Sequence, residues 1–234
     1  MEHLKDYIAE FDALAQRKTE NAFAQQGRGA GRGFLFFKRT VDVAGSAVGL
    51  IALLPLFAVV SGLIKRDDGG RVIYRRACVG KNGKAYVMYK FRTMIEDAEC
   101  KTDLFTAETL CKHLEGDKTI EDPRITRIGK FLRRTSLDEL PQLFSVLRGD
   151  MSLVGPRPVV EREAAEYGEQ RSLLLSVKPG ITGWWQVKGR KGCPYLSDEA
   201  KTMQLYYARH QSLWLDIKIL LLTVKAVLLR KDVP

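Results

Sequence analysis

The stretch VAGSAVGLIALLPLFAVVSGLI, residues 43–64, contains no charged side chain. At about 1.5 Å per helical residue, it is long enough to cross the roughly 30 Å hydrocarbon core of a bilayer. A buried core helix is the weaker interpretation, because helices of globular proteins rarely run so far without a polar face. The stretch begins too late in the chain for a signal peptide and lacks a small-residue cleavage site. The sequence therefore predicts a membrane helix.

The flanks and the centre of this stretch indicate its topology. Lys38 and Arg39 precede it and Lys65 and Arg66 follow it, so the positive-inside rule places both ends on the cytoplasmic side. Pro55 lies near the centre, where its missing N–H and its ring are expected to kink the helix. These features favour a re-entrant helix, which enters one leaflet and returns, over a straight span.

Composition limits the size of the fold and the kind of partner. A chain of 234 residues can bury one sizeable core with a small appendage. Its formal charge of +10 calls for nucleic acid, anionic lipid or a phosphorylated substrate. Because residues 1–33 carry equal numbers of acidic and basic side chains, the excess belongs to residues 34–234. The four cysteines have no CxxC spacing and the three histidines are scattered, which indicates reduced thiols and not a zinc site.

Local patterns predict the elements on either side of the apolar stretch. Residues 1–26 carry apolar side chains at helical spacing, and the Gly/Arg-rich residues 27–33 favour a flexible linker over a nucleic-acid element. Asn82-Gly83 separates two runs rich in β-forming residues, which predicts a β-hairpin. Residues 203–230 are predicted to be helical, and their apolar run broken by Lys218 and Lys225 fits an interfacial helix in the membrane plane, with a core helix as the alternative.

The stretch Thr135-Ser136-Leu137-Asp138-Glu139-Leu140-Pro141-Gln142 contains two adjacent carboxylates. Proline is tolerated only in the first turn of a helix, so a helix over residues 143–147 should start close to Asp138. The positive end of the helix dipole there favours ionised carboxylates and bound phosphate. Two neighbouring carboxylates also suit Mg²⁺, which shares a substrate phosphate. The alternative is a capping box, in which Ser136 caps the helix and Glu139 reaches back.

Three cations that precede the acidic pair in the chain are candidate phosphate ligands. Lys90 and Arg92 alternate at the end of the second predicted strand, so they should share one face, as a phosphate clamp or as a solvated edge. Arg133 comes five residues before Asp138, which is near enough to reach the same phosphate.

A fourth candidate, Arg157, lies between Pro156 and Pro158. Each proline fixes its own φ and pushes the preceding residue toward extended backbone, so Arg157 is held on a stiff segment. A preorganised guanidinium suits a bidentate grip on phosphate or carboxylate. A rigid loop with an incidental arginine is the alternative.

Six motifs together resemble those of the bacterial sugar transferases. This family comprises monotopic polyprenyl-phosphate phosphoglycosyl transferases, which begin capsule, exopolysaccharide and glycoprotein glycan assembly. The motifs are KFRTM at residues 90–94, SLDELPQ at 136–142, GDMS at 149–152, GPRP at 155–158, KPGITG at 178–183 and GR at 189–190. The resemblance runs from residue 34 to residue 230 and leaves residues 1–33 outside.

The resemblance implies a two-step transfer of a sugar 1-phosphate from a UDP-sugar to undecaprenyl phosphate, with release of UMP. Asp138 would attack the β-phosphate and form a phosphosugar-aspartate intermediate, and Glu139 together with Asp138 would hold Mg²⁺. Pro55 would mark the membrane turn. The cations implied to bind substrate phosphate are Lys90, Arg92, Arg133, Arg157 and Arg190, and the residues implied to be structural at the site are Pro156 and Pro158.

The sugar stays open, because residues 191–195 replace the Asn-containing stretch expected after Arg190. Overall resemblance to exopolysaccharide initiators favours a UDP-hexose such as UDP-galactose or UDP-glucose. A membrane-anchored scaffold of a polysaccharide export complex, without catalysis, is the alternative function. A nucleic-acid-binding protein is disfavoured by the apolar residues 43–64.

The sequence is thus expected to specify an α+β, mostly helical monotopic membrane protein with a re-entrant membrane helix, a β-hairpin and interfacial amphipathic helices. Residues 1–33 would form an amphipathic extension and linker, residues 34–66 the re-entrant helix and residues 67–234 the catalytic domain. The expected location is the cytoplasmic face of a bacterial inner membrane. The expected partners are a UDP-sugar, undecaprenyl phosphate and membrane lipid, with no nucleic acid and with homo-oligomerisation left open.

Overall fold

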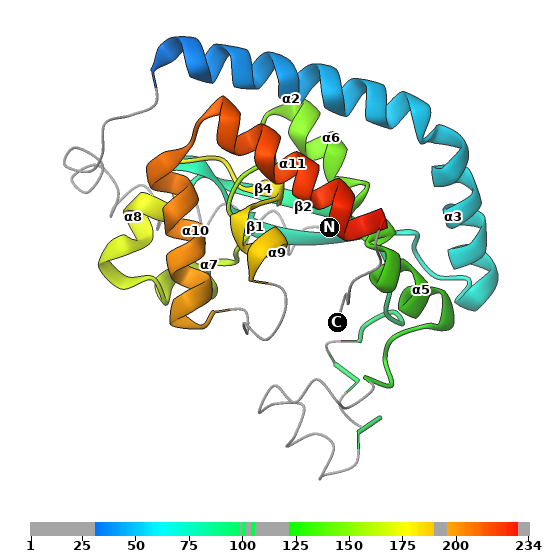
Figure 1. Ribbon diagram of the computed structural model, residues 1–234. Helices are drawn as coiled ribbons and strands as arrows, with labels where there is room; N and C mark the ends of the chain where they lie inside the picture. Colours follow the sequence, from blue (N-terminus) through cyan, green and yellow to red (C-terminus); the bar gives the residue numbers. More distant parts are fainter. Residues whose placement is uncertain (1–30, 99, 102–103, 106–121, 190–195, 229–234) are drawn as a thin grey trace. The chain divides into compact units, whose positions relative to one another are not determined.

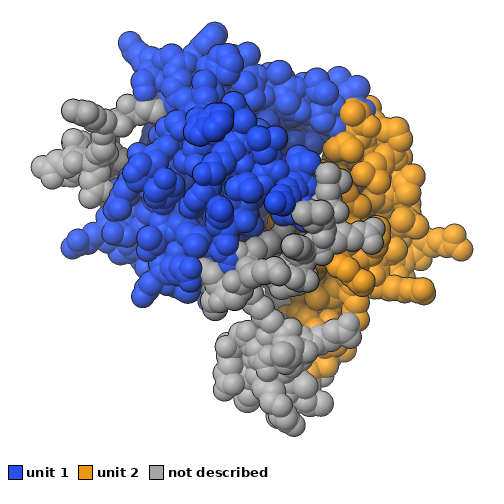
Figure 2. Space-filling view, viewed as in Figure 1, with its two compact units in different colours: residues 1–51, 75–89, 142–231 blue, residues 52–74, 90–141, 232–234 orange. Residues whose placement is uncertain are grey.

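The computed structural model describes residues 31–98, 100–101, 104–105, 122–189 and 196–228 (Figure 1). The chain divides into two compact units (Figure 2). Unit 1 comprises Met1–Ile51, Arg75–Tyr89 and Gln142–Lys231, and unit 2 comprises Ala52–Tyr74, Lys90–Pro141 and Asp232–Pro234. The predicted N-terminal helix and most of the predicted linker lie outside the described residues.

The described part of the chain is an α+β protein in which helices predominate, as predicted. In chain order its elements are α2 (Arg32–Ala52), α3 (Leu54–Asp68), β1 (Ile73–Val79), the 3₁₀ turn η1 (Lys81–Gly83), β2 (Ala85–Phe91), α5 (Arg127–Thr135), the 3₁₀ turn η2 (Leu137–Glu139), α6 (Gln142–Arg148), β3 (Ser152–Val154), α7 (Glu161–Ala165), the 3₁₀ turn η3 (Gly168–Gln170), α8 (Arg171–Leu174), β4 (Gly180–Thr182), α9 (Trp184–Lys188), α10 (Asp198–His210) and α11 (Leu213–Leu228).

The apolar stretch forms the helices α2 and α3, which are separated at Leu53. Pro55 lies in the first turn of α3, so the break falls two residues before the proline and not at it. This position follows from the chemistry of proline, which cannot donate to the carbonyl four residues back and whose ring clashes with that carbonyl. No single helix in the described ranges is long and apolar enough to cross a membrane, whereas α2 and α3 pass that test as a pair bent by 60°.

The predicted hairpin is confirmed, because β1 and β2 pair as a two-stranded sheet. The turn between them contains Asn82 and Gly83, with φ of 59° and 76°. Asparagine and glycine tolerate positive φ better than other residues, which is why this dipeptide is a strong signal for a hairpin.

Unit 1 has a second, parallel pair of short strands, β3 and β4, in which Ser152 lies opposite Gly180. The backbones approach so closely that a Cβ added at Gly180 would lie 2.0 Å from the backbone nitrogen of Gly155. Val154 of β3 packs in a core cluster with Tyr207 of α10 and Ile219 of α11. The parallel pair therefore fixes the position from which the chain continues into the segment 155–158.

The region predicted as helical over residues 203–230 is confirmed as helical up to Leu228, and it consists of two helices, α10 and α11. The break lies at Gln211 and Ser212. Ser212 caps the start of α11, because its hydroxyl accepts from Leu215 N at 3.2 Å and its carbonyl accepts from Asp216 N at 2.9 Å. A serine in this position satisfies N–H groups that a helix start leaves unpaired.

Candidate active site

The acidic pair lies in unit 2 and follows helix α5 in the chain, and α5 is fixed against the segment that comes after strand β2. The hydroxyl of Thr126 caps α5 by accepting from Gly129 N at 3.0 Å, and Thr126 N donates to Thr93 O at 3.1 Å. A Cβ added at Gly129 would lie only 1.9 Å from Thr93 O. The glycine thus allows α5 to meet the backbone of the chain after β2, and this contact fixes the helix that leads to Asp138.

The turn η2 is held by apolar side chains on both sides of the carboxylates. Leu137 and Leu140 pack against a core cluster that includes Phe91 of β2 and Leu132 of α5. The order Leu-Asp-Glu-Leu therefore anchors the turn at its two ends and leaves the two acids between the anchors. The sequence predicted this pair of acids but not the apolar support beneath it.

The predicted helix start is corrected by the structure. Asp138 and Glu139 belong to a 3₁₀ turn, and the α-helix α6 begins only at Gln142, after Pro141. Ser136 has a left-handed backbone with φ of 57° and makes no capping hydrogen bond through its side chain. The proposed capping box is therefore wrong for this stretch.

Lys90 lies beside the acidic pair. Its Nζ is 2.9 Å from Glu139 Oε1, and the two side chains are 19% and 27% exposed. Burial raises the pKa of Asp138, and the neighbouring Glu139 raises it further, whereas the charges of Lys90 and Arg133 lower it. The site thus contains a partly desolvated carboxylate whose ionised form is stabilised by two cations.

Arg133 of α5 is the second of these cations. Its Nε donates to Thr93 Oγ1 at 2.9 Å, which fixes the side chain to the chain segment after β2. Burial lowers the pKa of Arg133, and the charges of Asp138 and Asp122 raise it. Arginine nevertheless stays protonated in proteins, so Arg133 contributes a positive charge next to Asp138.

Arg92, predicted to act together with Lys90, has a different partner. Its guanidinium forms a two-pronged ion pair with Asp68, at the end of α3, and donates to Met94 O at 2.9 Å. The side chain is 7% exposed, and the ion pair with Asp68 is the largest cause that raises its pKa. These contacts connect the end of α3 to β2, and phosphate binding by Arg92 stays a prediction.

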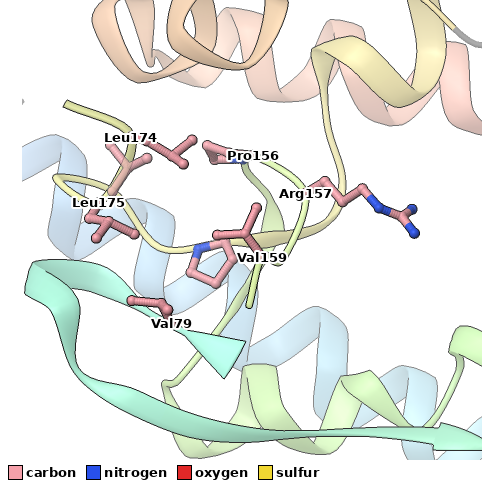
Figure 3. A pocket seen from close by; sticks show the side chains of 8 residues that line it. Val79, Pro156, Arg157, Val159, Leu174 and Leu175 are labelled. Atoms are coloured by element: carbon pink, nitrogen blue, oxygen red, sulfur yellow. The ribbon is translucent and has the colours of Figure 1, made fainter. Parts of the chain in front are cut away.

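Arg157 belongs to unit 1, where the stiffness of its segment comes from backbone pairing as well as from the prolines. Gly155 N donates to Thr182 O at 2.9 Å, and Gly180 N donates to Pro156 O at 2.8 Å. Figure 3 shows the apolar side chains behind this segment, from which the guanidinium of Arg157 extends away.

The Arg157 guanidinium carbon lies 5.8 Å from the centre of the Trp185 ring, within the range of a cation–π contact. Pro158 lies in the same segment, and Arg190 lies outside the described residues. Trp184, the other tryptophan of this region, stacks on Tyr206 with ring centres 5.7 Å apart.

Sequence reasoning missed a buried charge network in unit 1. Lys38 of α2 and Asp216 of α11 form an ion pair at 2.6 Å, and the Tyr207 hydroxyl donates to the same carboxylate at 2.6 Å. Asp42, 4% exposed, accepts from Ser152 Oγ at 3.0 Å and from a backbone N–H of β3. The sequence contains a signal for this network in the positions of the two acids. Asp42 directly precedes the apolar residues 43–64, and Asp216 lies within the mostly apolar residues 213–229.

The donor set fits a divalent cation only in part. In the ranges that the structure describes, no three His, Cys, Asp or Glu side chains gather as a metal site would require. Asp138 and Glu139 supply two adjacent carboxylates, and Mg²⁺ sites commonly combine one or two carboxylates with waters and substrate phosphates. The residues therefore fit an ion that the protein shares with a phosphorylated substrate.

Residues 34–230 match the family model described as "Bacterial sugar transferase". The match covers most of the chain, and the chain belongs to this family.

Three relatives illustrate the similarity. The chain is 44% identical over 198 residues to the galactosyl transferase CpsE of Streptococcus agalactiae, covering 83% of this chain and 43% of the relative. It is 43% identical over 204 residues to the undecaprenyl-phosphate galactose phosphotransferase of Salmonella typhimurium, covering 86% and 42%. It is 41% identical over 197 residues to the exopolysaccharide production protein ExoY of Sinorhizobium fredii, covering 83% and 86%. The chain thus spans less than half the length of the first two relatives and most of the third.

Proposed function

We propose that this protein is a phosphoglycosyl transferase, which moves a sugar 1-phosphate from a UDP-sugar to undecaprenyl phosphate and releases UMP. The observation that carries the proposal is the turn at Asp138, where a partly desolvated carboxylate lies near the charges of Lys90 and Arg133. The names of relatives from Salmonella and Komagataeibacter, which are undecaprenyl-phosphate galactose and glucose phosphotransferases, agree with this reaction.

In the first step a carboxylate oxygen of Asp138 attacks the β-phosphorus of the donor. The new bond joins that oxygen to phosphorus, while the bond from phosphorus to the bridging oxygen breaks and the electron pair leaves with UMP. In the second step an oxygen of undecaprenyl phosphate attacks the same phosphorus, the bond to Asp138 breaks, and the free carboxylate returns. No proton has to be removed from the nucleophile, because a carboxylate attacks in its ionised form.

The main obstacle to this chemistry is repulsion between anions. Lys90 and Arg133 are fixed beside Asp138 before any substrate arrives, so their charges offset the repulsion without reorganisation. The partial burial of Asp138 strengthens these interactions, because charges act over a lower effective dielectric away from water. Arg157 is assigned to the donor's phosphate, since its guanidinium extends from a rigid segment.

Mg²⁺ would be held by Asp138 and Glu139 together with the donor, and when bound it neutralises charge on the diphosphate. The ion pair between Lys90 and Glu139 supports this assignment, because Glu139 already lies where a cation is favoured.

The exposed apolar faces of unit 1 support association with a membrane. On α2, Phe36 and Ile51 are 77% and 70% exposed. On α11, Trp214, Ile217, Leu221 and Val224 are exposed at helical spacing and form one stripe. Exposed apolar surface on this scale marks an interaction site, and we assign it to the lipid of the bacterial inner membrane at its cytoplasmic face, where undecaprenyl phosphate is met.

The donor is proposed to be UDP-galactose or UDP-glucose. Several relatives are named as galactose or glucose transferases, among them proteins of Erwinia amylovora and Xanthomonas campestris.

The experiment measures UMP release by the purified protein from a panel of UDP-sugars, with Mg²⁺ and undecaprenyl phosphate. One sugar is expected to yield UMP, and Asp138→Asn is expected to abolish the release while it preserves folding and vesicle binding. Full function of Asp138→Asn in cells would favour the scaffold instead.

A further inference from the structure

A buried amide side chain lies behind the arginine segment of unit 1. Gln204 of α10 is 1% exposed. Its Oε1 accepts from the backbone N–H of Arg157 at 2.9 Å, and its Nε2 donates to the Tyr167 hydroxyl at 2.8 Å. Because a backbone N–H can only donate, the oxygen of the amide must face Arg157, which fixes the orientation of the whole group.

The hydrogen bond to Gln204 is made by the one backbone N–H that residues 156–158 contain. Pro156 and Pro158 lack an N–H, so Arg157 has the sole backbone donor of this tripeptide. The hydrogen bond from Arg157 to Gln204 therefore fixes the backbone at the residue whose guanidinium is assigned to phosphate.

The segment is held on both sides of this point by backbone pairing. Pro156 O accepts from Gly180 N at 2.8 Å, and Val159 O accepts from Val79 N at 2.9 Å. The partners before and after the arginine thus come from β4 and β1, and the partner at the arginine comes from α10. Three separate elements of unit 1 determine where the side chain of Arg157 begins.

A second polar group on α10 acts on the preceding strand. The hydroxyl of Tyr207, three residues after Gln204 and so on the same side of the helix, lies 3.1 Å from Val154 O and donates its single hydrogen to Asp216 Oδ1 at 2.6 Å. The helix therefore meets the backbone of β3 and of the arginine segment through two polar side chains one turn apart.

We infer that Gln204 is a positioning residue for Arg157. The amide of Gln204 holds the backbone of Arg157 so that the guanidinium meets the donor's phosphate. The inference rests on the proposed function, since that function assigns Arg157 to the phosphate. Its distinctive consequence is that removal of the Gln204 amide changes activity only through Arg157, whereas an ordinary core residue changes it only through stability.

The first test is hydrogen exchange at Arg157 in the full chain, read by mass spectrometry from peptides that overlap residues 155–158. Gly155 and Arg157 have the exchangeable backbone amides within residues 155–158, and the difference between peptides that end before and after Arg157 isolates its N–H. In Gln204→Leu we expect exchange about tenfold faster or more. Leu205→Val removes one buried methylene group from the core on the same helix, and in this variant we expect no change in exchange at the Arg157 amide.

Gln204→Glu is the variant that guards against misfolding. In the neutral acid form that burial favours, its carbonyl oxygen still accepts from Arg157 N and its hydroxyl donates to the Tyr167 hydroxyl, so protection is expected to be kept. Unchanged exchange at Arg157 in Gln204→Leu would overturn the inference whatever reaction the protein performs.

The second test is a double-mutant cycle on kcat/KM for UMP release. Gln204→Leu is expected to lower kcat/KM about tenfold in the presence of Arg157 and less than twofold in an Arg157→Ala background. Equal losses in both backgrounds would overturn the inference. A wild-type protein that releases no UMP from any donor would instead remove the proposed function and leave the exchange result to decide the role of Gln204.

Discussion

The ion pair between Lys38 and Asp216 yields the sharpest stability prediction. The two side chains are only 12% and 10% exposed, and their charged atoms are 2.6 Å apart. In Lys38→Met, the carboxylate of Asp216 loses its cation but keeps the hydrogen bond from Tyr207. Breaking a buried pair on one side costs about 3 to 5 kcal/mol, because a charge is left buried without compensation.

We expect a loss of about 3 kcal/mol, at the low end of that range, because the Asp216 carboxylate keeps the hydrogen bond from the Tyr207 hydroxyl after Lys38 has gone. For a chain of this size, such a loss corresponds to a fall in Tm of about 6 to 12 °C. The assay is thermal unfolding of the detergent-solubilised protein, followed by intrinsic fluorescence at one protein concentration.

The matched control is the double variant Lys38→Met with Asp216→Asn. Its amide oxygen can still accept from Tyr207, and no charge remains buried at this position. We expect the double variant to recover to within about 1 kcal/mol of the wild type. If the two substitutions instead add their losses, the reasoning from an uncompensated charge is refuted.

The same variant has a defined pH dependence. Burial raises the pKa of Asp216, Lys38 lowers it, and the nearby Asp42 raises it. Removal of Lys38 therefore raises the pKa further above its unfolded value, so the native state binds more protons than the unfolded state between the two values. Stability from this group is present at the acidic side of that window and falls as pH rises, so the loss in Lys38→Met should be smaller in acid than at neutral pH.

Further outcomes are expected at the proposed site and at the membrane face. Lys90→Met should lower kcat/KM about a hundredfold, and because Lys90 lowers the pKa of Asp138, the acidic limb of the pH–rate profile should move to higher pH; an unmoved limb would contradict this. Gly129→Ala should lose more than about 3 kcal/mol of stability in chemical denaturation, because its Cβ would meet Thr93 O at 1.9 Å, and a native Tm would contradict it. Leu221→Ser, at a side chain 67% exposed, should weaken binding to vesicles in sedimentation without lowering Tm.

Local sequence signals predicted the parts of the fold that local chemistry determines. Asn82-Gly83 identified the hairpin because positive φ is a property of those two residues themselves. Pro55 located the helix break to within a few residues for the same reason. Of the predicted site, Lys90, Arg133, Asp138 and Glu139 lie together in unit 2.

The parts that could not be predicted depend on contacts between distant residues. The strands β3 and β4 have three residues each, which is too short for an alternation of apolar and polar side chains to be recognised. They pair only because the chain folds back and brings residues 180–182 beside residues 152–154. Lys38 and Asp216 are 178 residues apart, so neither shows in the sequence that the other neutralises it. Arg92 alternates with Lys90 as expected of a clamp, yet Asp68 engages it, and no local pattern encodes that choice.

Peptide mass spectrometry, after incubation with the donor sugar nucleotide and no lipid acceptor, tests whether Asp138 forms a covalent bond to the phosphosugar. We predict that the peptide containing Asp138 gains the mass of one sugar phosphate, that added undecaprenyl phosphate removes it, and that Asp138→Asn never acquires it. An adduct on another residue, or UMP release that requires both substrates at once with no adduct, would rule out the covalent intermediate at Asp138.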